Sequence, residues 1–503
     1  MTRVLFAPFE PDAGSLDSGG SRKTVNAMPT GSPKAPRYGP MSSLQDYSTD
    51  ALTGRCLGTL SVRDSSGNTH LFAGDTTKLY KLPTDLSFDD ITRASGGAYA
   101  VPTNEFWWSV FWNSSQVIMG NGADAAQEFT LGSSTKFAAL AGSPPAARHA
   151  AVVGPHLMLG STASDAWGVQ WCAAADATTW TTGGGAAGDS QGFDEGGWVR
   201  GIANGRLFSY LWQEELIRRI TYTRDNNHFV FDIVARDLGL AAPRSLVSFG
   251  SQNFFLASDG FYRHDGETFF PIGRGRVDQW FYDRVDDTKS IETYGVVDPS
   301  DTKIYWAYYT ANTDYANNII SYDYYRDRWA EIELDTGVTV LSVLLPQGVS
   351  LEDLDSSPYS GDIDDLRLTT SGELIGSLDD RSLQGGLPAL GAFNSSKKMA
   401  FFGGANLAAC IDTSESEVIP GRRCNIVNTR PLADVSTAKI AVGWRESMSA
   451  STVFGESVAQ EDNGDCPQEI DGRLMKARME IPAGAIWTEA MGVDFDAIDA
   501  GAI

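Results

Sequence analysis

The 503-residue sequence predicts an all-β protein: a β-propeller of five or six blades, an additional C-terminal β-sandwich-like domain and an extended N-terminal arm. Two observations lead to this fold class. Runs of about five to eight residues alternate apolar with polar side chains, are rich in aromatic and β-branched residues, and end at Asp-Gly or similar turns. The 52 glycines interrupt any long stretch of helical periodicity. Repeated hairpins of this kind are typical of propeller blades.

Residues 1–50 are expected to form the arm. The segment contains the runs GSLDSGGSRKT and NAMPTGSPKAPRYGPMSS, which are crowded with Gly, Ser and Pro. Such a composition cannot bury enough apolar surface to fold alone. We therefore expect the arm to become ordered only against a neighbouring subunit or ring.

Residues 51–387 carry the repeated strand units. The pattern begins near Arg55 with LGTLSVRD, a Ser-Ser-Gly-Asn turn and THLFAGD, and it returns along the chain. Asn204-Gly205 between two alternating runs indicates a tight hairpin. Five or six units fit between Arg55 and about Gly376, and the last of them includes SGELIGSLD.

An acidic insertion at about 347–366 interrupts these units. Its carboxylates could offer oxygen ligands to calcium, but they lack the spacing of a calcium-binding loop, and a solvated loop is the alternative. The residues concerned are Glu352, Asp353, Asp355, Asp362, Asp364 and Asp365. From about Pro388 the alternating runs become longer, which predicts a separate C-terminal β-domain at 388–503.

The net charge of −25 argues against a broad nucleic-acid-binding face, because such a face must supply Lys and Arg to phosphates. The apolar run near the N-terminus is cut by Pro8 and is too short for a secretion signal. No stretch reaches the roughly 18 apolar residues of a membrane span. We expect a soluble protein that is made and assembled in the cytoplasm.

Residues that could carry chemistry are sparse. The histidines are scattered and have no metal-ligand spacing, and the odd number of cysteines contains no C-x-x-C pair. These residues are His70, His149, His156, His228 and His264, and Cys56, Cys172, Cys410, Cys424 and Cys466. We expect reduced, buried thiols, and the spacing leaves open whether Cys410 and Cys424 meet across a hairpin.

The run Gly273-Arg274-Gly275-Arg276 lacks the Gly-Lys-Ser/Thr ending of a phosphate-binding loop. We expect a turn whose two arginines, Arg274 and Arg276, are subunit contacts that meet the carboxylates of a neighbouring copy.

An enzyme of the propeller-shaped glycosidase class is the main catalytic alternative. The segment 164–171 approaches a sialidase Asp box, but its spacing is one residue off and no second copy follows. We predict no catalytic, cofactor-binding or metal-binding residue and no cofactor. A carbohydrate-binding propeller that recognises a host surface polysaccharide through Trp107, Trp108 and Trp112 is a second alternative, although so continuous an aromatic run favours a buried core.

Several sequence segments follow one another in the same order as in a known protein family, which they resemble. They are VNAMP at 25–29, AGDTTKLYKL, VIMGNGADAAQEF, LMLGSTASDAWGVQWCAAADATTW and, above all, the segment 244–283. That last segment reads as a strand, an Asp-Gly turn, a second strand and a helix that contains Trp280 and Phe281. Over residues 20–345 the chain resembles the tail hub or nozzle proteins of short-tailed bacteriophages, also called packaged-DNA stabilisation proteins.

The resemblance implies a structural protein of the virion tail and not an enzyme. It implies a ring of six copies below the portal and adaptor rings, which extends and closes the channel through which DNA leaves the capsid and carries tail fibres or a needle. DNA would pass through the lumen without sequence-specific binding. An acidic wall fits that role, because it repels phosphate.

Overall fold

The structure, a computed structural model, describes residues 2–14, 19–33, 35–181, 188–204, 208–223, 228–298, 301–346 and 388–501, and the backbone of 359–360 and 367–368. The predicted all-β class is confirmed. Within these residues helix is confined to α1 (Asp278–Tyr282) and the 3₁₀ turns η1 (Pro243–Ser245) and η2 (Ser290–Glu292). No helix in the described ranges is both long and apolar enough to cross a membrane.

Five separate sheets each consist of four antiparallel strands that follow one another in the chain. The first contains β6 (Gly58–Arg63), β7 (Thr69–Gly74), β8 (Leu79–Leu82) and β9 (Asp89–Asp90), and the second β10 (Trp108–Trp112), β11 (Gln116–Gly120), β12 (Gln127–Thr130) and β13 (Ala138–Ala139). The third contains β14 (Ala147–Val153), β15 (His156–Thr162), β16 (Val169–Trp171) and β17 (Asp189–Gln191). The fourth contains β18 (Val199–Asn204), β19 (Ser209–Gln213), β20 (Leu216–Tyr222) and β21 (Phe229–Arg236), and the fifth β22 (Val247–Phe249), β23 (Gln252–Ala257), β24 (Gly260–His264) and β25 (Phe269–Pro271).

Two further four-stranded runs lie inside a larger sheet. The sixth run is again consecutive and contains β26 (Tyr294–Val297), β27 (Lys303–Tyr308), β28 (Ala316–Asp323) and β29 (Arg328–Leu344). The seventh begins with the second half of β29, which pairs with β32 (Ala389–Asn394), and continues through β33 (Met399–Asn406). Its outer strand is β5 (Ser42–Asp46), which comes from the N-terminal segment.

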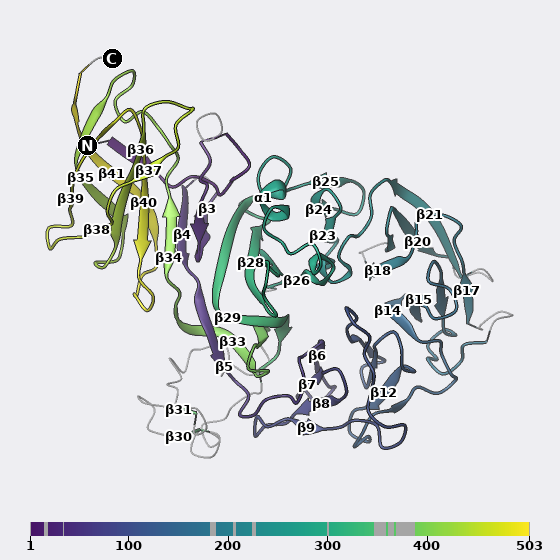
Figure 1. The fold of residues 1–503 in the computed structure, drawn as a ribbon. Helices are drawn as coiled ribbons and strands as arrows, with labels where there is room; N and C mark the ends of the chain where they lie inside the picture. Colours follow the sequence, from purple (N-terminus) through teal and green to yellow (C-terminus); the bar gives the residue numbers. More distant parts are fainter. Residues whose placement is uncertain are drawn as a thin grey trace.

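The seven runs follow one another around a ring (Figure 1). The first strands of neighbouring runs lie side by side, and β29 lies against β6, so that the last run meets the first. A separate apolar core fills each junction: Phe72 and Val117 lie in the core between the first and second runs, and Leu71 and Phe393 lie in the core between the first and seventh. This arrangement is consistent with a β-propeller.

Apart from β30 (Tyr359–Ser360) and β31 (Arg367–Leu368), which pair with each other, the remaining described strands form two sheets that share one core. One sheet contains β3 (Ala27–Ser32), β4 (Ala35–Pro40), β41 (Ala490–Asp499), β35 (Cys424–Ala433) and β39 (Cys466–Gly472), with β1 (Thr2–Leu5) added on β41. The other contains β2 (Thr24–Val25), β34 (Ala409–Asp412), β40 (Leu474–Ile481), β36 (Lys439–Arg445), β37 (Val453–Phe454) and β38 (Val458–Ala459). Side chains of both sheets, including Ile411, Met479 and Phe495, pack in the same core. In Figure 1 this part carries both chain termini.

The two-residue strand β2 connects these sheets to the ring. Val25 pairs in parallel with Glu331 of β29 and antiparallel with Cys410 of β34. As a result β29, β2 and β34 belong to one continuous sheet. A short N-terminal strand thereby joins the sixth run of the ring to the C-terminal strands.

Asn26 makes the key contacts of this joint. Its backbone adopts a left-handed conformation, with φ of 56°, and its amide donates to the carbonyl of Glu331 at 2.8 Å. Its side-chain Nδ2 donates to the carbonyl of Ala408 at 2.9 Å, and its Oδ1 accepts from the amide of Glu333 at 2.9 Å. The side chain therefore satisfies backbone groups on both sides of β2.

The arrangement corrects one expectation. The arm is ordered within the chain itself and not only against a neighbouring subunit, because strands β1 to β5 pair with strands of the same chain. The count of five or six blades stays a prediction; the described residues contain six runs that are consecutive in sequence and a seventh, completed by β5, that was not anticipated. The domain limits at residues 50 and 387 stay predictions, and SGELIGSLD and the acidic insertion lie outside the described residues.

We predict that Asn26→Ala lowers the free energy of unfolding by about 1–3 kcal/mol, because it leaves a part-buried amide and a part-buried carbonyl without their hydrogen-bond partner. Chemical denaturation of purified protein measures the change.

Asn312→Ala is the matched control. Asn312 also has a positive φ, of 65°, but it is exposed, so its replacement should cost at most about 1 kcal/mol. Equal losses in the two variants would show that backbone conformation, and not the joint, determines the effect.

Candidate functional site

Six charged residues mark the starts of the first strands of six successive runs. Each residue either precedes its strand by two or three positions or is the second residue of the strand. They are Arg55, Glu105, Arg148, Arg200, Arg244 and Glu292, and we call them the axial charged set. Since first strands lie side by side around the ring, these residues gather at one end of its centre, and Arg55, Glu105, Arg244 and Glu292 line one pocket.

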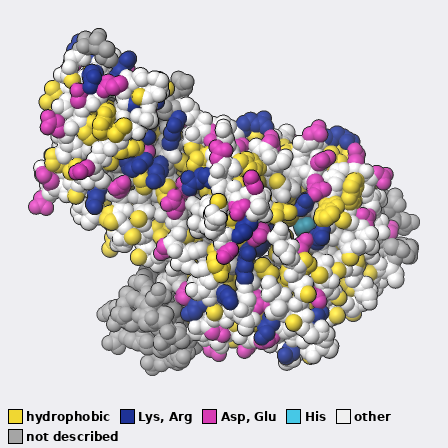
Figure 2. Space-filling view, in the orientation of Figure 1, with side chains coloured by type: hydrophobic (Ala, Val, Ile, Leu, Met, Phe, Trp, Pro, Cys, Tyr) yellow, Lys and Arg dark blue, Asp and Glu magenta, His cyan; other side chains and the backbone are white. Residues whose placement is uncertain are grey.

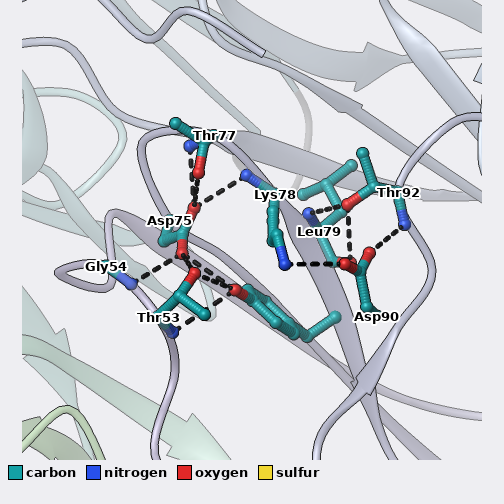
Figure 3. A network of polar contacts seen from close by, with 9 residues as sticks. Thr53, Gly54, Asp75, Thr77, Lys78, Leu79, Asp90 and Thr92 are labelled. Atoms are coloured by element: carbon teal, nitrogen blue, oxygen red, sulfur yellow. Dashed lines mark hydrogen bonds and ion pairs between the residues drawn. The ribbon is translucent and has the colours of Figure 1, made fainter. Parts of the chain in front are cut away.

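Asp75 positions the segment that delivers Arg55 (Figure 3). This segment leads from β5 to β6. The Oδ2 of Asp75 accepts hydrogen bonds from the hydroxyl of Thr53 at 2.9 Å, the amide of Gly54 at 2.8 Å and the hydroxyl of Tyr80 at 3.0 Å. Gly54 has no room for a side chain, because a Cβ there would lie 3.0 Å from this carboxylate.

The second oxygen of Asp75 holds the turn between β7 and β8. Its Oδ1 accepts from the amides of Thr77 and Lys78, both at 2.7 Å. Burial alone would raise the pKa of Asp75, but these hydrogen bonds favour the charged form and lower the pKa overall. The buried carboxylate therefore connects the entering segment to the first sheet.

Most of the axial charged set is paired. Arg55 donates to Glu292 at 2.8 Å and to the hydroxyl of Tyr309. Arg148 pairs with Glu105 at 2.8 Å. The second pair joins neighbouring runs, whereas the first spans the pocket, since Glu292 precedes the sixth run and Arg55 the first.

Arg200 also forms an ion pair, with the carboxylate of Glu214 at 2.5 Å. Its charge and that of Arg148 act on the buried His149. Desolvation, to which the two arginines add, lowers the pKa of His149 to about 3. His149 is therefore neutral at physiological pH, as expected beside an excess of positive charge.

Arg244 differs from the other arginines of the set. Its guanidinium lies 4.7 Å from the ring centre of Phe106 and 4.8 Å from that of Tyr294. Within the described residues its guanidinium makes no ion pair, unlike those of Arg55, Arg148 and Arg200. Burial lowers the pKa of Arg244, but a guanidinium stays charged at any pH at which the protein is folded.

The pocket at this end of the ring has a volume of about 260 Å³. Arg244 and Phe106 form part of its wall, together with apolar and neutral polar side chains. The latter are Leu57, Val101, Pro102 and Ile291, and Thr76, Thr103 and Asn104. Chemically, the site presents one arginine without an ion pair among the described residues, beside a mixed wall, which suits a small anion.

The sequence-predicted residues Arg274 and Arg276 lie elsewhere, beside α1. Arg274 is exposed and pairs with Asp259 at 2.8 Å. Arg276 is largely buried and bridges Glu10 of the N-terminal segment at 3.0 Å and Asp327 of the β28–β29 turn at 2.7 Å. Both arginines thus have carboxylates within the chain, and their role as subunit contacts stays a prediction.

The helix that the resemblance leads us to expect after β25 is α1. Asp12 of the N-terminal segment accepts the amides of Gln279 and Trp280, each at 2.8 Å. Within the helix, the Asp278 carboxyl fits between Gly260 and Gly273, where a Cβ would come within 2.1 Å and 1.9 Å of its oxygens. Only glycine leaves room for this carboxyl.

The other residues that the sequence singled out lie away from this pocket or outside the described ranges. Trp107, Trp108 and Trp112 are buried, as the core interpretation predicted, so none of them presents a face to a glycan. All five cysteines are free, and Cys410 and Cys424 lie on strands of different sheets. Across the described ranges, no three His, Cys, Asp or Glu side chains gather as metal ligands would. The six carboxylates considered for calcium lie outside those ranges.

Sequence reasoning missed the axial charged set. A signal was present, because a charged residue precedes or enters the apolar first strand of each unit. Recognising it requires the strand order within each unit, since only first strands face the centre. Asp75 carried no such signal, because it resembles any Asp in a polar turn.

We predict that Asp75→Asn lowers the free energy of unfolding at pH 7 by about 2–4 kcal/mol, since an amide nitrogen cannot accept the hydrogen bonds of Oδ1 or Oδ2. The folded-state pKa lies below the usual 3.8, so the carboxylate's contribution is present above that pH and is lost as the pH falls through the folded pKa. Denaturation between pH 7 and pH 3 should show the two proteins converging. A gap that persists unchanged at low pH would contradict this, and Asp89→Asn, on the exposed β9, is the control.

The contribution of Asp278 to the free energy of unfolding should depend on pH in the opposite direction to that of Asp75. Burial raises its pKa to about 6, Asp12 and Asp259 add to the rise, and the Phe261 amide and Arg274 oppose it. Its favourable contribution is therefore present at low pH and lost as the pH rises through about 6. Asp278→Asn keeps an acceptor for the Phe261 amide and should stabilise the protein by about 1–2 kcal/mol at pH 8, allowing for screening.

Thermal unfolding at pH 5 and pH 8 measures this effect, with the exposed Asp283→Asn as control. Destabilisation by Asp278→Asn at pH 8 would show that the ionised carboxylate is needed.

Comparisons with known proteins give no family. No protein-family model and no curated protein matches the chain. Among solved structures, selenomethionine-substituted virginiamycin B lyase from Staphylococcus aureus is 12% identical, with 58% of this chain and 89% of that chain covered and a TM-score of 0.37. A functionally unknown protein from Desulfotomaculum acetoxidans is 11% identical, with 60% and 96% covered and a TM-score of 0.37. The computationally designed Ika8 protein is 10% identical, with 72% and 99% covered and a TM-score of 0.35. Since these TM-scores lie below 0.5, the similarities carry no argument about this chain.

Proposed function

We propose that the chain is a structural subunit of the tail hub, or nozzle, of a short-tailed bacteriophage. In this proposal the seven runs are the blades of one closed propeller, and the two-sheet part is a docking domain. Six copies form a ring below the portal and adaptor rings and carry tail fibres or a needle. The role is not enzymatic.

The observation that carries the proposal is where the family-like phrases lie. The phrase at 25–29 contains Asn26, which joins the ring to the C-terminal strands. The phrase at 244–283 forms the fifth sheet and α1, and it binds the N-terminal segment through Glu10 and Asp12. Two of the segments on which the resemblance rests, 25–29 and 244–283, therefore connect the N-terminal segment to distant parts of the chain.

Mechanical rigidity also supports this role. A channel wall must keep its shape while a stiff polymer passes, and here a packed core fills every junction between runs. The N-terminal segment supplies β5, the outer strand of the seventh run. The seventh run is therefore held by strand pairing between the N-terminal segment and β33.

Charge supports a conduit that does not grip DNA. Six chains of −25 give a ring of about −150. On the face in Figure 2, Lys and Arg are interspersed with Asp and Glu. This pattern offers phosphates no continuous basic track on that face.

The proposal predicts a closed oligomer. Native mass measurement should give about 325 kDa for six chains of 54.2 kDa, and a ring by electron microscopy. If Arg274 is a subunit contact, Arg274→Glu should weaken assembly at least about tenfold. Arg422→Glu is the matched control, because Arg422 is also exposed and paired within the chain, with Asp499.

A chain that stays monomeric at about 10 µM and above would count against the ring. Binding of duplex DNA to the purified assembly at about 150 mM salt tests the conduit separately. Weak binding is expected, whereas tight binding with a steep salt dependence would mean that a basic surface grips phosphates.

A further inference from the structure

We infer that the axial pocket binds a small organic anion whose carboxylate or phosphate group lies against Arg244. The inference does not depend on the proposed ring, because a single chain supplies every described wall residue of this pocket.

The first argument is the state of Arg244. Its guanidinium lies 4.7 Å from the ring centre of Phe106 and 4.8 Å from that of Tyr294, at cation–π distances. The N–H groups in the guanidinium plane are donors of strong, bidentate hydrogen bonds to carboxylate or phosphate. Among the described residues the Arg244 guanidinium has no ion pair, whereas Arg55, Arg148 and Arg200 each have a carboxylate.

The second argument is the local balance of charge. The pocket contains Glu105 and Glu292, but each is already paired with an arginine other than Arg244. Because Glu105 pairs with Arg148 from outside the pocket, Arg244 is the charged wall residue that has no ion pair among the described residues. A ligand with one negative group would complete the set without requiring any existing pair to break.

The third argument is size and lining. At about 260 Å³ the pocket lies just below the range of sites for drug-sized molecules, so it suits a compact ligand. Apolar wall residues such as Val101 and Ile291 alternate with Thr103 and Asn104, which can donate to and accept from hydroxyl groups. A monosaccharide bearing a carboxylate or a phosphate matches this combination.

Purified protein should be titrated with glucuronate, glucose 6-phosphate and glucose, and binding followed by calorimetry and by protein-observed NMR. We expect one or both anions to bind and glucose to bind at least tenfold more weakly. The two anions distinguish a carboxylate site from a phosphate site.

Arg244→Gln should weaken anion binding at least tenfold, because it removes the charged donor while keeping a polar side chain of similar reach. Arg244→Lys keeps the charge but not the bidentate geometry and should bind with intermediate affinity. Arg422→Gln, which changes an exposed arginine outside the pocket, should bind as the unchanged protein does.

Melting temperatures of all variants show whether each is folded. If Arg244→Gln fails to fold, the Arg244→Lys variant and the chemical shifts of residues around Phe106 still test the site. The inference is overturned if neither anion binds at 10 mM, or if binding is the same in the Arg244 variants and in the unchanged protein.

Discussion

The pairing of N-terminal strands with strands far along the chain is the interaction on which the rest of the structure depends. Six of the runs complete themselves from consecutive strands, but β29, β32 and β33 lack a fourth strand until β5 arrives. An unpaired sheet edge exposes backbone groups that must find partners. The entropy of closing so long a loop grows only slowly with its length, so the burial of a whole strand can offset it.

The candidate site follows from this closure. The chain leaves β5 at Asp46 and must cross to the centre of the ring to begin β6, and Asp75 holds that crossing segment in place. Arg55 lies at the end of the crossing and pairs with Glu292 from the far side of the pocket. Closure therefore brings together charges that are separated by more than 200 residues in sequence, and it does so beside the one axial arginine for which the described chain provides no carboxylate.

Local features of the fold could be predicted from the sequence. Alternating runs with Asp-Gly and Asn-Gly turns predicted hairpins, and β23–β24 and β18–β19 are paired as hairpins. The continuous aromatic run around Trp108 predicted a core position, and its three tryptophans are buried. These features depend on residues close in sequence, where periodicity and turn chemistry are informative.

Long-range features could not be predicted in the same way. Strand β2 has only two residues and therefore no periodicity, and the Gly, Ser and Pro content around it resembles that of a flexible arm. Its partners Glu331 and Cys410 are more than 300 residues away. Arg276 illustrates the same limit: its sequence context indicates an exposed turn, but Glu10 and Asp327 enclose it.

Hydrogen–deuterium exchange of the intact chain tests the closure most directly. If the N-terminal segment is an integral part of the fold, backbone amides of β2 and β5 should exchange as slowly as those of β29 and β33, with which they pair. Exchange of β2 and β5 at the rate of an unstructured chain, while β29 and β33 stay protected, would contradict the closure.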